Sequence, residues 1–265
     1  MIFLLLSCSR VIRYLNQKYI FSMVSKNQIK LITSLQQKKY RVVHGLFIAE
    51  GFKVIQELLH SNFELHHLFQ TQVLFESVPN ELKSLISPEE LGKISALATA
   101  NNCLAIFKIP AMNPIVENGL TVVLDDIRDP GNLGTILRLC DWFGVDQLVC
   151  SKETVDLYNP KVVQATMGSI SRVKVSYVDL VEWLTQAKLP VYGAVMTGTN
   201  IYKERLPTEA IIVLGNEANG ISPAIEEVIK NRITIPRFGK LKQTESLNVA
   251  TAAAIVLSEF CRNHE

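Results

Sequence analysis

The sequence lacks the cysteine patterns that hold metals or form redox pairs. Its five cysteines are scattered and contain no C-x-x-C pair: Cys8, Cys103, Cys140, Cys150 and Cys261. Cysteines spaced in this way are typical of small buried side chains in a reducing compartment. His66 and His67 are adjacent, so they would not share one face of a helix. We therefore predict no metal site.

Long apolar runs are absent as well. No stretch approaches the roughly 20 residues that a membrane-spanning helix needs, so we expect no contact with a membrane. The first segment, MIFLLLSCSR, holds a short apolar run with no positive charge before it, less than the ~7–15 residues of a signal core. Met23 opens MVSKNQIKLI, a suitable start. We expect residues 1–22 to be an extension or a misassigned start, and the protein to be cytoplasmic.

Three common catalytic loops are also missing. The sequence contains no G-x-x-x-x-G-K-[ST], which argues against a Walker nucleotidase. No G-x-G-x-x-G follows an apolar strand, which weakens both a dinucleotide site and the glycine-rich site of Rossmann methyltransferases. Without G-x-S-x-G, a Ser-His-Asp hydrolase is unsupported.

The composition describes a soluble globular protein. With 265 residues, 48% of them apolar and 20% charged, the chain can form one large domain or two ordinary ones. The net charge of +2 is unevenly spread: nine Lys or Arg and one acid lie between Met1 and Lys53, and five basic residues and no acid lie between Lys230 and Lys242. Such clusters indicate either polyanion contact or a solvated rim, and the charges alone leave both open.

Residues 23–110 alternate between helical and strand patterns. Apolar spacing predicts helices over 27–41, 52–61 and 87–95, and strands over 45–51, 65–71 and 103–109. These elements make a small α/β module, and residues 111–119 follow it as a turn-rich linker.

Residues 120–265 repeat a strand, loop and helix pattern. Strands are expected at 120–127, 147–150, 191–196, 210–215 and 232–236, and helices at 135–144, 159–169 and 222–231. This alternation predicts a parallel sheet covered on both faces.

In parallel sheets of this kind, ligands bind beyond the carboxyl ends of the strands. Three loops rich in Gly, Asn or Ser lie there: RDPGNLGTILR, GNEANGIS and RFGKLKQTESLN. Such residues let the backbone approach a ligand closely.

The last helix, within NVATAAAIVLSEF, has almost no polar face, although a terminal helix normally has one. Something must therefore surround it. An ordinary buried helix would explain the pattern too.

Three segments together carry a resemblance. NLGTILRLCDWFG, VLGNEANGIS and IPRFGKLKQTESLNVATAAAIVLSEF resemble the signature segments of the SpoU-type RNA 2′-O-ribose methyltransferases of the SPOUT class, over about Leu120 to Phe260. The resemblance implies an α/β domain, residues 120–265, with a deep trefoil knot that encloses the last helix. FIAEGFKVIQELL makes residues 23–110 similar to a ribosomal-protein-like RNA substrate-binding domain.

The resemblance also implies S-adenosylmethionine as cofactor, bent among the three loops. Carried over, the cofactor-binding residues are Met196, Thr197, Leu214, Gly215, Asn216, Gly220, Ile235, Pro236 and Leu247. A side chain at Gly215 is expected to occupy the ligand's place; a simple turn glycine is the alternative.

The implied catalytic set is Arg138, Asn132, Glu217, Ser246 and Asn248. A guanidinium keeps its proton, so Arg138 is expected to clamp a phosphate and stabilise negative charge instead of acting as a base. An RNA phosphate is one candidate for the proton acceptor. Glu217 is expected to be buried and to hold Asn side chains or a backbone amine in place.

RNA contact is expected from both basic clusters, through Lys38, Lys39, Arg41, Arg237, Lys240 and Lys242. The stretch KLKQT between Gly239 and Glu245 is longer than usual in the family, and Arg237 stands where Met is common. This loop either reaches toward RNA phosphate or simply bulges.

The function implied is methylation of a ribose 2′-hydroxyl in RNA. The first module favours 23S ribosomal RNA over tRNA as the substrate. A tRNA enzyme, or a non-catalytic RNA-binding or ribosome-assembly protein on the same scaffold, are the alternatives. The resemblance further implies a homodimer.

Overall fold

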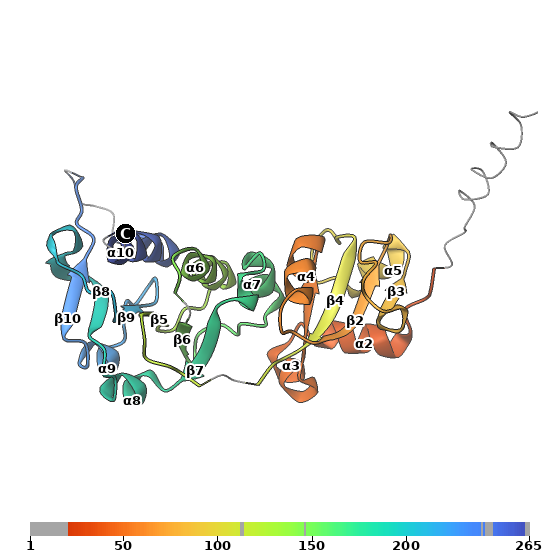
Figure 1. The fold of residues 1–265 in the computed structure, drawn as a ribbon, viewed down its shortest axis with the longest axis horizontal. Helices are drawn as coiled ribbons and strands as arrows, with labels where there is room; N and C mark the ends of the chain where they lie inside the picture. The colour runs from red at the N-terminus through yellow and green to blue at the C-terminus, as the bar shows by residue number, and fades with distance from the viewer. Residues whose placement is uncertain (1–20, 112–113, 146, 240, 242–245, 263–265) are drawn as a thin grey trace, which may run out of the picture.

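The computed structural model describes residues 21–111, 114–145, 147–239, 241 and 246–262. The chain forms two sheets side by side along the long axis of the molecule, with the C-terminal helix α10 at the end far from the N-terminal sheet (Figure 1). Residues 1–20, including Cys8, lie outside the described part.

The N-terminal unit, as we call the elements from α2 to β4, is built on a four-stranded mixed sheet. The strand order is β1-β4-β2-β3, in which β4 pairs antiparallel with β1 and β2 while β2 and β3 are parallel. Its elements are α2 (Lys26–Ser34), α3 (Lys38–His44), β1 (Leu46–Glu50), α4 (Phe52–Leu59), β2 (Leu65–Gln70), η1 (Asn80–Leu82), β3 (Lys83–Leu85), α5 (Pro88–Ile94) and β4 (Cys103–Lys108).

The C-terminal unit, from β5 to α10, is built on a six-stranded sheet in which every described pairing is parallel, with the order β10-β8-β9-β5-β6-β7. The predicted parallel α/β architecture is confirmed. Its elements are β5 (Leu120–Leu124), α6 (Pro130–Trp142), β6 (Gln147–Ser151), α7 (Pro160–Ala165), η2 (Ser169–Ser171), β7 (Lys174–Val178), α8 (Leu180–Thr185), β8 (Val191–Asn200), η3 (Ile201–Lys203), β9 (Ala210–Leu214), α9 (Pro223–Glu226), β10 (Asn231–Thr234) and α10 (Val249–Cys261).

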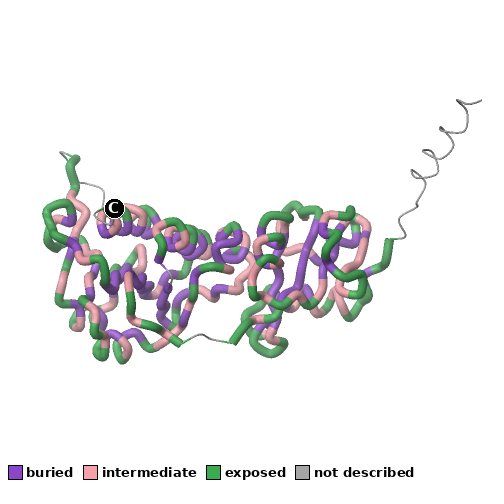
Figure 2. Tube along the Cα trace, viewed as in Figure 1, coloured by how far each residue is buried: buried purple, intermediate pink, exposed green. Residues whose placement is uncertain are grey.

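Helices cover both faces of this sheet because its central strands are apolar on both sides. Val122 and Leu124 of β5 pack with α6, α7 and α10, whereas Val123 packs with α8 and α9. Figure 2 shows the resulting purple, buried chain through the interior of both units. None of the helices in the described residues is long and apolar enough to cross a membrane.

Cys103, Cys140 and Cys150 are buried, as predicted. Burial raises the pKa of the Cys103 thiol to about 11 and that of Cys140 to about 12. Both side chains are therefore protonated, unreactive parts of the core at neutral pH.

The sequence patterns missed several local details. The single helix expected at 27–41 is two helices, α2 and α3, with Leu35 at the end of the first. The Leu35 carbonyl oxygen accepts a 2.8 Å hydrogen bond from Arg41 Nη1. Helix α6 begins earlier than expected, at Pro130, because Asp129 caps it by accepting from the Asn132 amide at 2.8 Å. The helix expected at 222–231 is only the short α9, and strands β3 and β7 and helix α8 were not anticipated.

Arg41 corrects one sequence expectation. Its side chain is 3% exposed, and its Nε donates to Asp156 Oδ2 of the C-terminal unit at 2.8 Å. The nearby rings of Phe47 and Tyr158 pack across the same boundary, with centroids 4.8 Å apart. Arg41 therefore joins the two units and is not a surface residue that contacts RNA.

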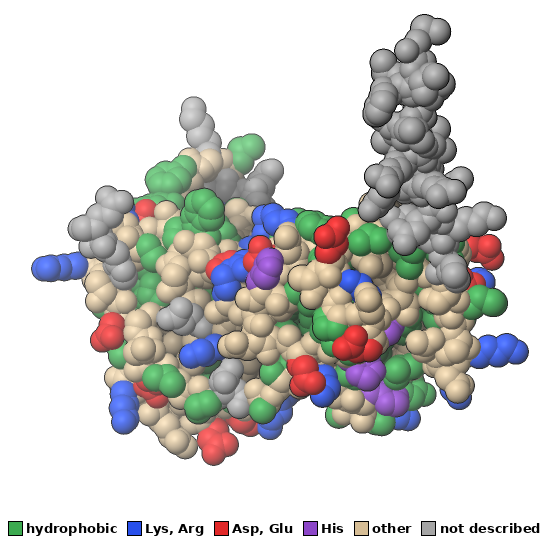
Figure 3. All heavy atoms as spheres, turned by 45° about the vertical axis from the view of Figure 1, so that its right-hand side comes forward, with side chains coloured by type: hydrophobic (Ala, Val, Ile, Leu, Met, Phe, Trp, Pro, Cys, Tyr) green, Lys and Arg blue, Asp and Glu red, His purple; other side chains and the backbone are tan. Residues whose placement is uncertain are grey.

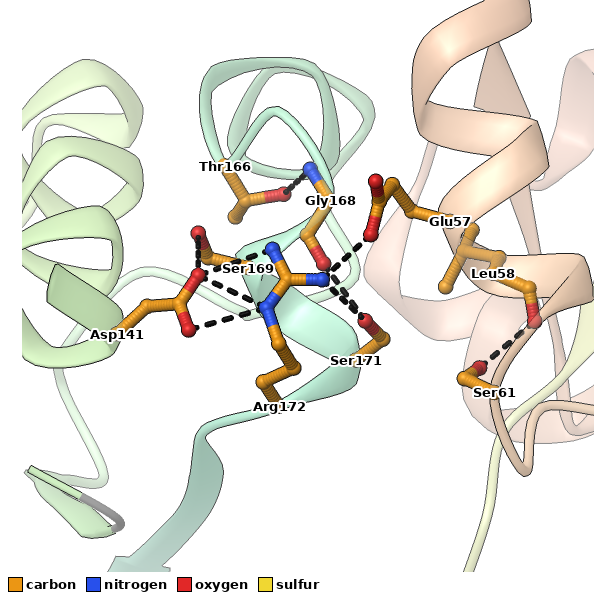
Figure 4. A network of polar contacts seen from close by, with 9 residues as sticks. All are labelled: Glu57, Leu58, Ser61, Asp141, Thr166, Gly168, Ser169, Ser171 and Arg172. Atoms are coloured by element: carbon orange, nitrogen blue, oxygen red, sulfur yellow. Dashed lines mark hydrogen bonds and ion pairs between the residues drawn. The ribbon is translucent and has the colours of Figure 1, made fainter. Parts of the chain in front are cut away.

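A second polar contact joins the units on the side where α4, α6 and η2 meet (Figure 4). Arg172 donates from Nε to both oxygens of Asp141 at 2.9 and 3.0 Å, and from Nη1 to Glu57 of α4. Burial opposes ionisation of Asp141, but hydrogen bonds from Arg172 and Ser169 outweigh it and lower its pKa. Glycine is required at Gly168, because φ is +102° and a Cβ would lie 2.6 Å from Glu57 Cγ.

We predict that Asp156→Ala lowers the free energy of unfolding by about 3–5 kcal/mol, because it leaves the Arg41 guanidinium buried without its carboxylate. Urea denaturation followed by circular dichroism measures the change. As the matched control, Glu64→Ala breaks the exposed pair with Lys108, whose side chains are 66% and 51% exposed, and should cost less than about 1 kcal/mol. Equal losses in the two variants would contradict the prediction.

Candidate active site

Three loops meet at the carboxyl ends of β5, β9 and β10. We call them the first loop (residues 125–129), the second loop (215–222) and the third loop (235–248, of which 240 and 242–245 are not described). Asp125 N donates to Leu214 O at 3.0 Å, and Asp125 Oδ2 accepts from Ser222 N at 2.7 Å. Asn216 Nδ2 donates to Asp126 O at 2.7 Å. The first loop is therefore tied once to the end of β9 and twice to the second loop.

Asn132, in the first turn of α6, links these loops to the third. Its Nδ2 donates to Glu217 of the second loop, and its Oδ1 accepts from Asn248 Nδ2 of the third loop at 2.9 Å. A carboxylate only accepts hydrogen bonds, so Glu217 fixes which end of the Asn132 amide faces it and leaves the oxygen for Asn248. Asn248 Oδ1 in turn caps α10 by accepting from the amides of Ala250 and Thr251 at 3.0 and 3.2 Å.

A cavity of about 1450 Å³ opens between the second loop, the third loop and β8. Its wall includes all nine residues that the sequence assigned to cofactor binding: Met196, Thr197, Leu214, Gly215, Asn216, Gly220, Ile235, Pro236 and Leu247. Glu217 and Ser246 of the proposed catalytic set line it too. Segments far apart in the sequence thus share one concave surface.

An irregularity in β8 shapes one side of the cavity. Along β10, Arg232 pairs with Gly193 but the next residue, Ile233, pairs with Thr199. The intervening residues 194–198 of β8 have no ladder partner on β10, although Thr234 Oγ1 donates to Met196 O at 3.2 Å, and Ala194 to Thr197 line the cavity. Bulges of this kind redirect side chains beside functional sites.

Glycine at position 215 has a reason within the loop itself. A Cβ there would lie 2.2–2.4 Å from backbone atoms of Gly220 and Ile221 in the same loop, so the returning chain excludes a side chain. The two arms of the loop are held together by Asn216 and Gly220, whose amides and carbonyls exchange hydrogen bonds of 2.9 and 2.8 Å.

Arg138 stands apart from the other proposed catalytic residues. It is exposed on α6 and does not line the cavity, and its side chain makes no hydrogen bond or ion pair with any described residue. Six residues beyond Asn132, it lies roughly 9 Å further along the helix and on a different face. Asn132 and Glu217 are half-buried, and Ser246 and Asn248 are exposed, so Glu217 is less buried than predicted.

The residues proposed for RNA contact are dispersed. Lys38 and Lys39 are exposed on α3, and Arg237 lines the cavity. Lys240 and Lys242 lie outside the described residues. On the face drawn in Figure 3, basic and acidic side chains are interspersed and do not gather into one basic patch.

Sequence reasoning missed Asp125 and Asp126. Asp125 is 5% exposed and binds the second loop, while Asp126 has a positive φ of 56°, which few residues other than glycine adopt. The signal was present, because two acids directly follow a fully buried apolar strand.

Within the described residues, no group of three or more His, Cys, Asp or Glu is placed to hold a metal ion.

Comparison with known proteins decides the family. The model of the SpoU rRNA methylase family matches residues 119–258, more than half of the chain. The chain belongs to the SpoU rRNA methylase family. It is therefore a methyltransferase, as the three signature segments indicated. Residues 26–105 match a second model, the MRM3-like substrate binding domain.

Individual relatives of this SpoU-family chain agree. A solved structure of a putative RNA methyltransferase of the TrmH family from Porphyromonas gingivalis is 40% identical, with a TM-score of 0.84 over 91% of this chain and 99% of that one. An AdoMet-bound rRNA methyltransferase from Sinorhizobium meliloti is 27% identical, with a TM-score of 0.80 over 92% and 97%. The 23S rRNA (guanosine(2553)-2′-O)-methyltransferase RlmP of Bacillus subtilis is 28% identical over 88% of this chain and 96% of its own.

We predict that Gly215→Ala destabilises the second loop by about 1–3 kcal/mol or more, because its Cβ overlaps the backbone of residues 220 and 221. Thermal and urea unfolding would measure the loss. Gly239→Ala is the matched control on the same cavity wall: a Cβ there meets no atom within 4 Å, so the change should stay within about 0.5 kcal/mol. A Gly215→Ala protein as stable as this control would refute the packing argument.

Proposed function

We propose that this protein transfers the methyl group of S-adenosylmethionine to a ribose 2′-hydroxyl in ribosomal RNA, and that its substrate is the RNA of the large subunit. The observation that carries the proposal is the link through Asn132, which joins all three signature loops beside one cavity. Membership of the SpoU rRNA methylase family and the names of several relatives support the substrate class.

The cavity fits S-adenosylmethionine in size and lining. Cavities for small molecules are usually about 300–1,000 Å³, so 1450 Å³ leaves room for a cofactor and for part of a nucleotide. Backbone around Leu214–Asn216 and Ile235–Pro236 would hold the adenine and ribose. The cofactor supplies a methyl group on a sulfonium, an activated electrophile.

The protein's own residues would bind and orient the RNA. Asn132, Glu217 and Asn248 hold the loops in one arrangement, and Ser246 presents a hydroxyl at the cavity wall that can donate to or accept from the target ribose. The 2′-hydroxyl is a weak acid and must lose its proton as it attacks, so negative charge develops on its oxygen.

Arg138 keeps its charge throughout and cannot accept that proton. It would clamp a phosphate next to the target and stabilise the developing negative charge, while an RNA phosphate accepts the proton. Its exposed position on α6, outside the cavity, suits a contact with the RNA backbone better than a contact with the cofactor.

The N-terminal unit would hold the RNA. We assign residues 23–110 to an RNA substrate-binding domain with a ribosomal-protein-like fold, 111–119 to a linker and 120–265 to the methyltransferase domain. The match of residues 26–105 to the MRM3-like substrate binding domain supports the first assignment.

We also propose that the C-terminal segment is knotted. It leaves β10 at the edge of the sheet, yet Asn248 reaches Asn132 and α10 packs on α6, the helix that follows the more central β5. A last helix that packs on α6 and is tied to Asn132 in this way is what a threaded C-terminal segment would give, and these contacts support the proposal.

The face of α6 that carries Thr135, Arg138 and Trp142 would join a second copy of the chain. Trp142 is 83% exposed, and exposed tryptophans are frequent anchors of protein interfaces. Arg138 lies about one turn nearer to the loops than Trp142, so RNA bound across the pair could still reach it.

Sedimentation equilibrium should therefore give a dimer at micromolar concentration, and Trp142→Lys should shift it toward monomer by placing a charge in the apolar interface. Val181→Lys on α8, another exposed apolar position, is the control and should remain dimeric. A monomeric native protein would contradict the dimer.

The purified protein should transfer labelled methyl groups from S-adenosylmethionine to large-subunit ribosomal RNA, yielding a 2′-O-methylnucleoside by mass spectrometry after nuclease digestion. Arg138→Ala should lower the rate at least about 100-fold, as loss of one transition-state contact does, with cofactor binding by calorimetry unchanged.

Lys174→Ala, at an exposed position on β7, is the control and should behave as the native protein. Methylation of tRNA alone would overturn the ribosomal assignment. No methylation of either RNA, combined with no binding of the cofactor, would favour a non-catalytic RNA-binding protein. An Arg138→Ala rate within a few fold of normal would remove that residue from catalysis.

A further inference from the structure

Two aromatic side chains stack just outside the cavity. Tyr202 of η3 and Phe238 of the third loop have ring centroids 6.3 Å apart and an interplanar angle of 27°. They are separated by more than thirty residues in the sequence, so their meeting is a tertiary arrangement and not a local pattern.

The pair lies on the outer side of the cavity wall. Ile201, the neighbour of Tyr202, is fully buried and lines the cavity, and so do Arg237 and Gly239 on either side of Phe238. The sequence neighbours of each aromatic residue thus line the cavity, whereas the aromatic residue itself is exposed and is not part of the lining. The two rings therefore border the entrance to the site where the target ribose would lie.

Both rings are reached by solvent. Phe238 is 81% exposed and Tyr202 38%, and Leu241, three residues after Phe238 in the same loop, is 79% exposed. Large apolar side chains grouped on a surface mark a binding site more often than chance. Tyr202 is also held in place, because its amide donates to Asn200 Oδ1 at 3.0 Å in the cap of η3.

The charges that stand next to the pair in the sequence favour a polyanion. Lys203, Arg205 and Arg237 adjoin the two aromatic residues in the chain, against one acid, Glu204. Exposed aromatic rings flanked by cations are the chemistry that single-stranded RNA-binding sites use, in which bases stack on rings while cations attract the backbone. A protein partner would explain the apolar area but not this excess of positive charge.

We propose that Tyr202 and Phe238 form a stacking platform for an unpaired nucleobase that flanks the methylated nucleotide. This inference rests on the proposed function for the identity of the polymer. The platform would hold the neighbouring base at the rim, and so direct the target ribose into the cavity.

The test compares a short unstructured RNA oligonucleotide with an abasic chain of the same length and charge, each bound to the full-length protein and measured by fluorescence anisotropy. Phe238→Ala and Tyr202→Ala should weaken binding of the RNA by about 5- to 100-fold, the range spanned by base–aromatic stacking, and leave the abasic chain unaffected. Cofactor affinity by calorimetry should not change.

Two further substitutions at the same position separate stacking from apolar contact. Phe238→Tyr keeps an aromatic ring and should bind the RNA as the native protein does, whereas Phe238→Leu keeps apolar area without a ring and should bind weakly. Native-like binding by Phe238→Leu, or an equal loss for the abasic chain, would overturn the platform. A change of sedimentation in Phe238→Ala would instead assign the patch to a second copy of the chain.

The outcome is separable from the proposed activity. If native protein binds RNA with the expected dependence on the ring but transfers no methyl group, the platform stands and the enzymatic proposal falls. If it methylates RNA while Phe238→Ala and Tyr202→Ala bind normally, the activity stands and the platform falls.

Discussion

The amide of Asn132 is the contact on which the geometry of the site depends. It donates to a carboxylate of the second loop and accepts from an amide of the third, while its own backbone is held by the cap of α6. Each partner is fixed in turn: Asn248 caps α10, and the second loop is closed on itself by Asn216 and Gly220. Because one side chain bonds to both loops, each loop is held to α6 by its own hydrogen bond, and the two loops are held to each other through Asn132.

A parallel sheet brings these loops together in the first place, since the carboxyl ends of its strands share one edge. The irregular pairing between β8 and β10 then opens space there, because five residues of β8 are released from the ladder. Contacts such as Arg41 with Asp156 fix the N-terminal unit against this sheet at the same time. The N-terminal unit, which we propose to bind RNA, is thereby kept at a set position relative to the cavity of the C-terminal unit.

Much of this arrangement could be predicted from the sequence, because strand and helix periodicity and the edge rule are local or topological. They located the three loops, and the resemblance to the family assigned the nine residues that line the cavity. They could not show that Arg41 is buried. In the sequence Arg41 stands close to Lys38 and Lys39, and nothing local distinguishes a basic residue that faces solvent from one that binds Asp156. Nor could they give the reason for Gly215, which depends on the return of the chain at Gly220. Such features depend on partners distant in sequence.

Because Arg41 is buried, it cannot contribute a surface charge for RNA binding, and other residues have to account for the affinity. On the face drawn in Figure 3, acidic and basic side chains are interspersed and the net charge of the chain is only +2, so no large basic patch on that face supplies the binding free energy. A few cations near the cavity, joined to exposed aromatic rings, can do so with a smaller dependence on salt, because stacking releases no counterions. Phe238 stands only four residues beyond the end of β10 and is 81% exposed, so a base can reach its ring next to the cavity wall.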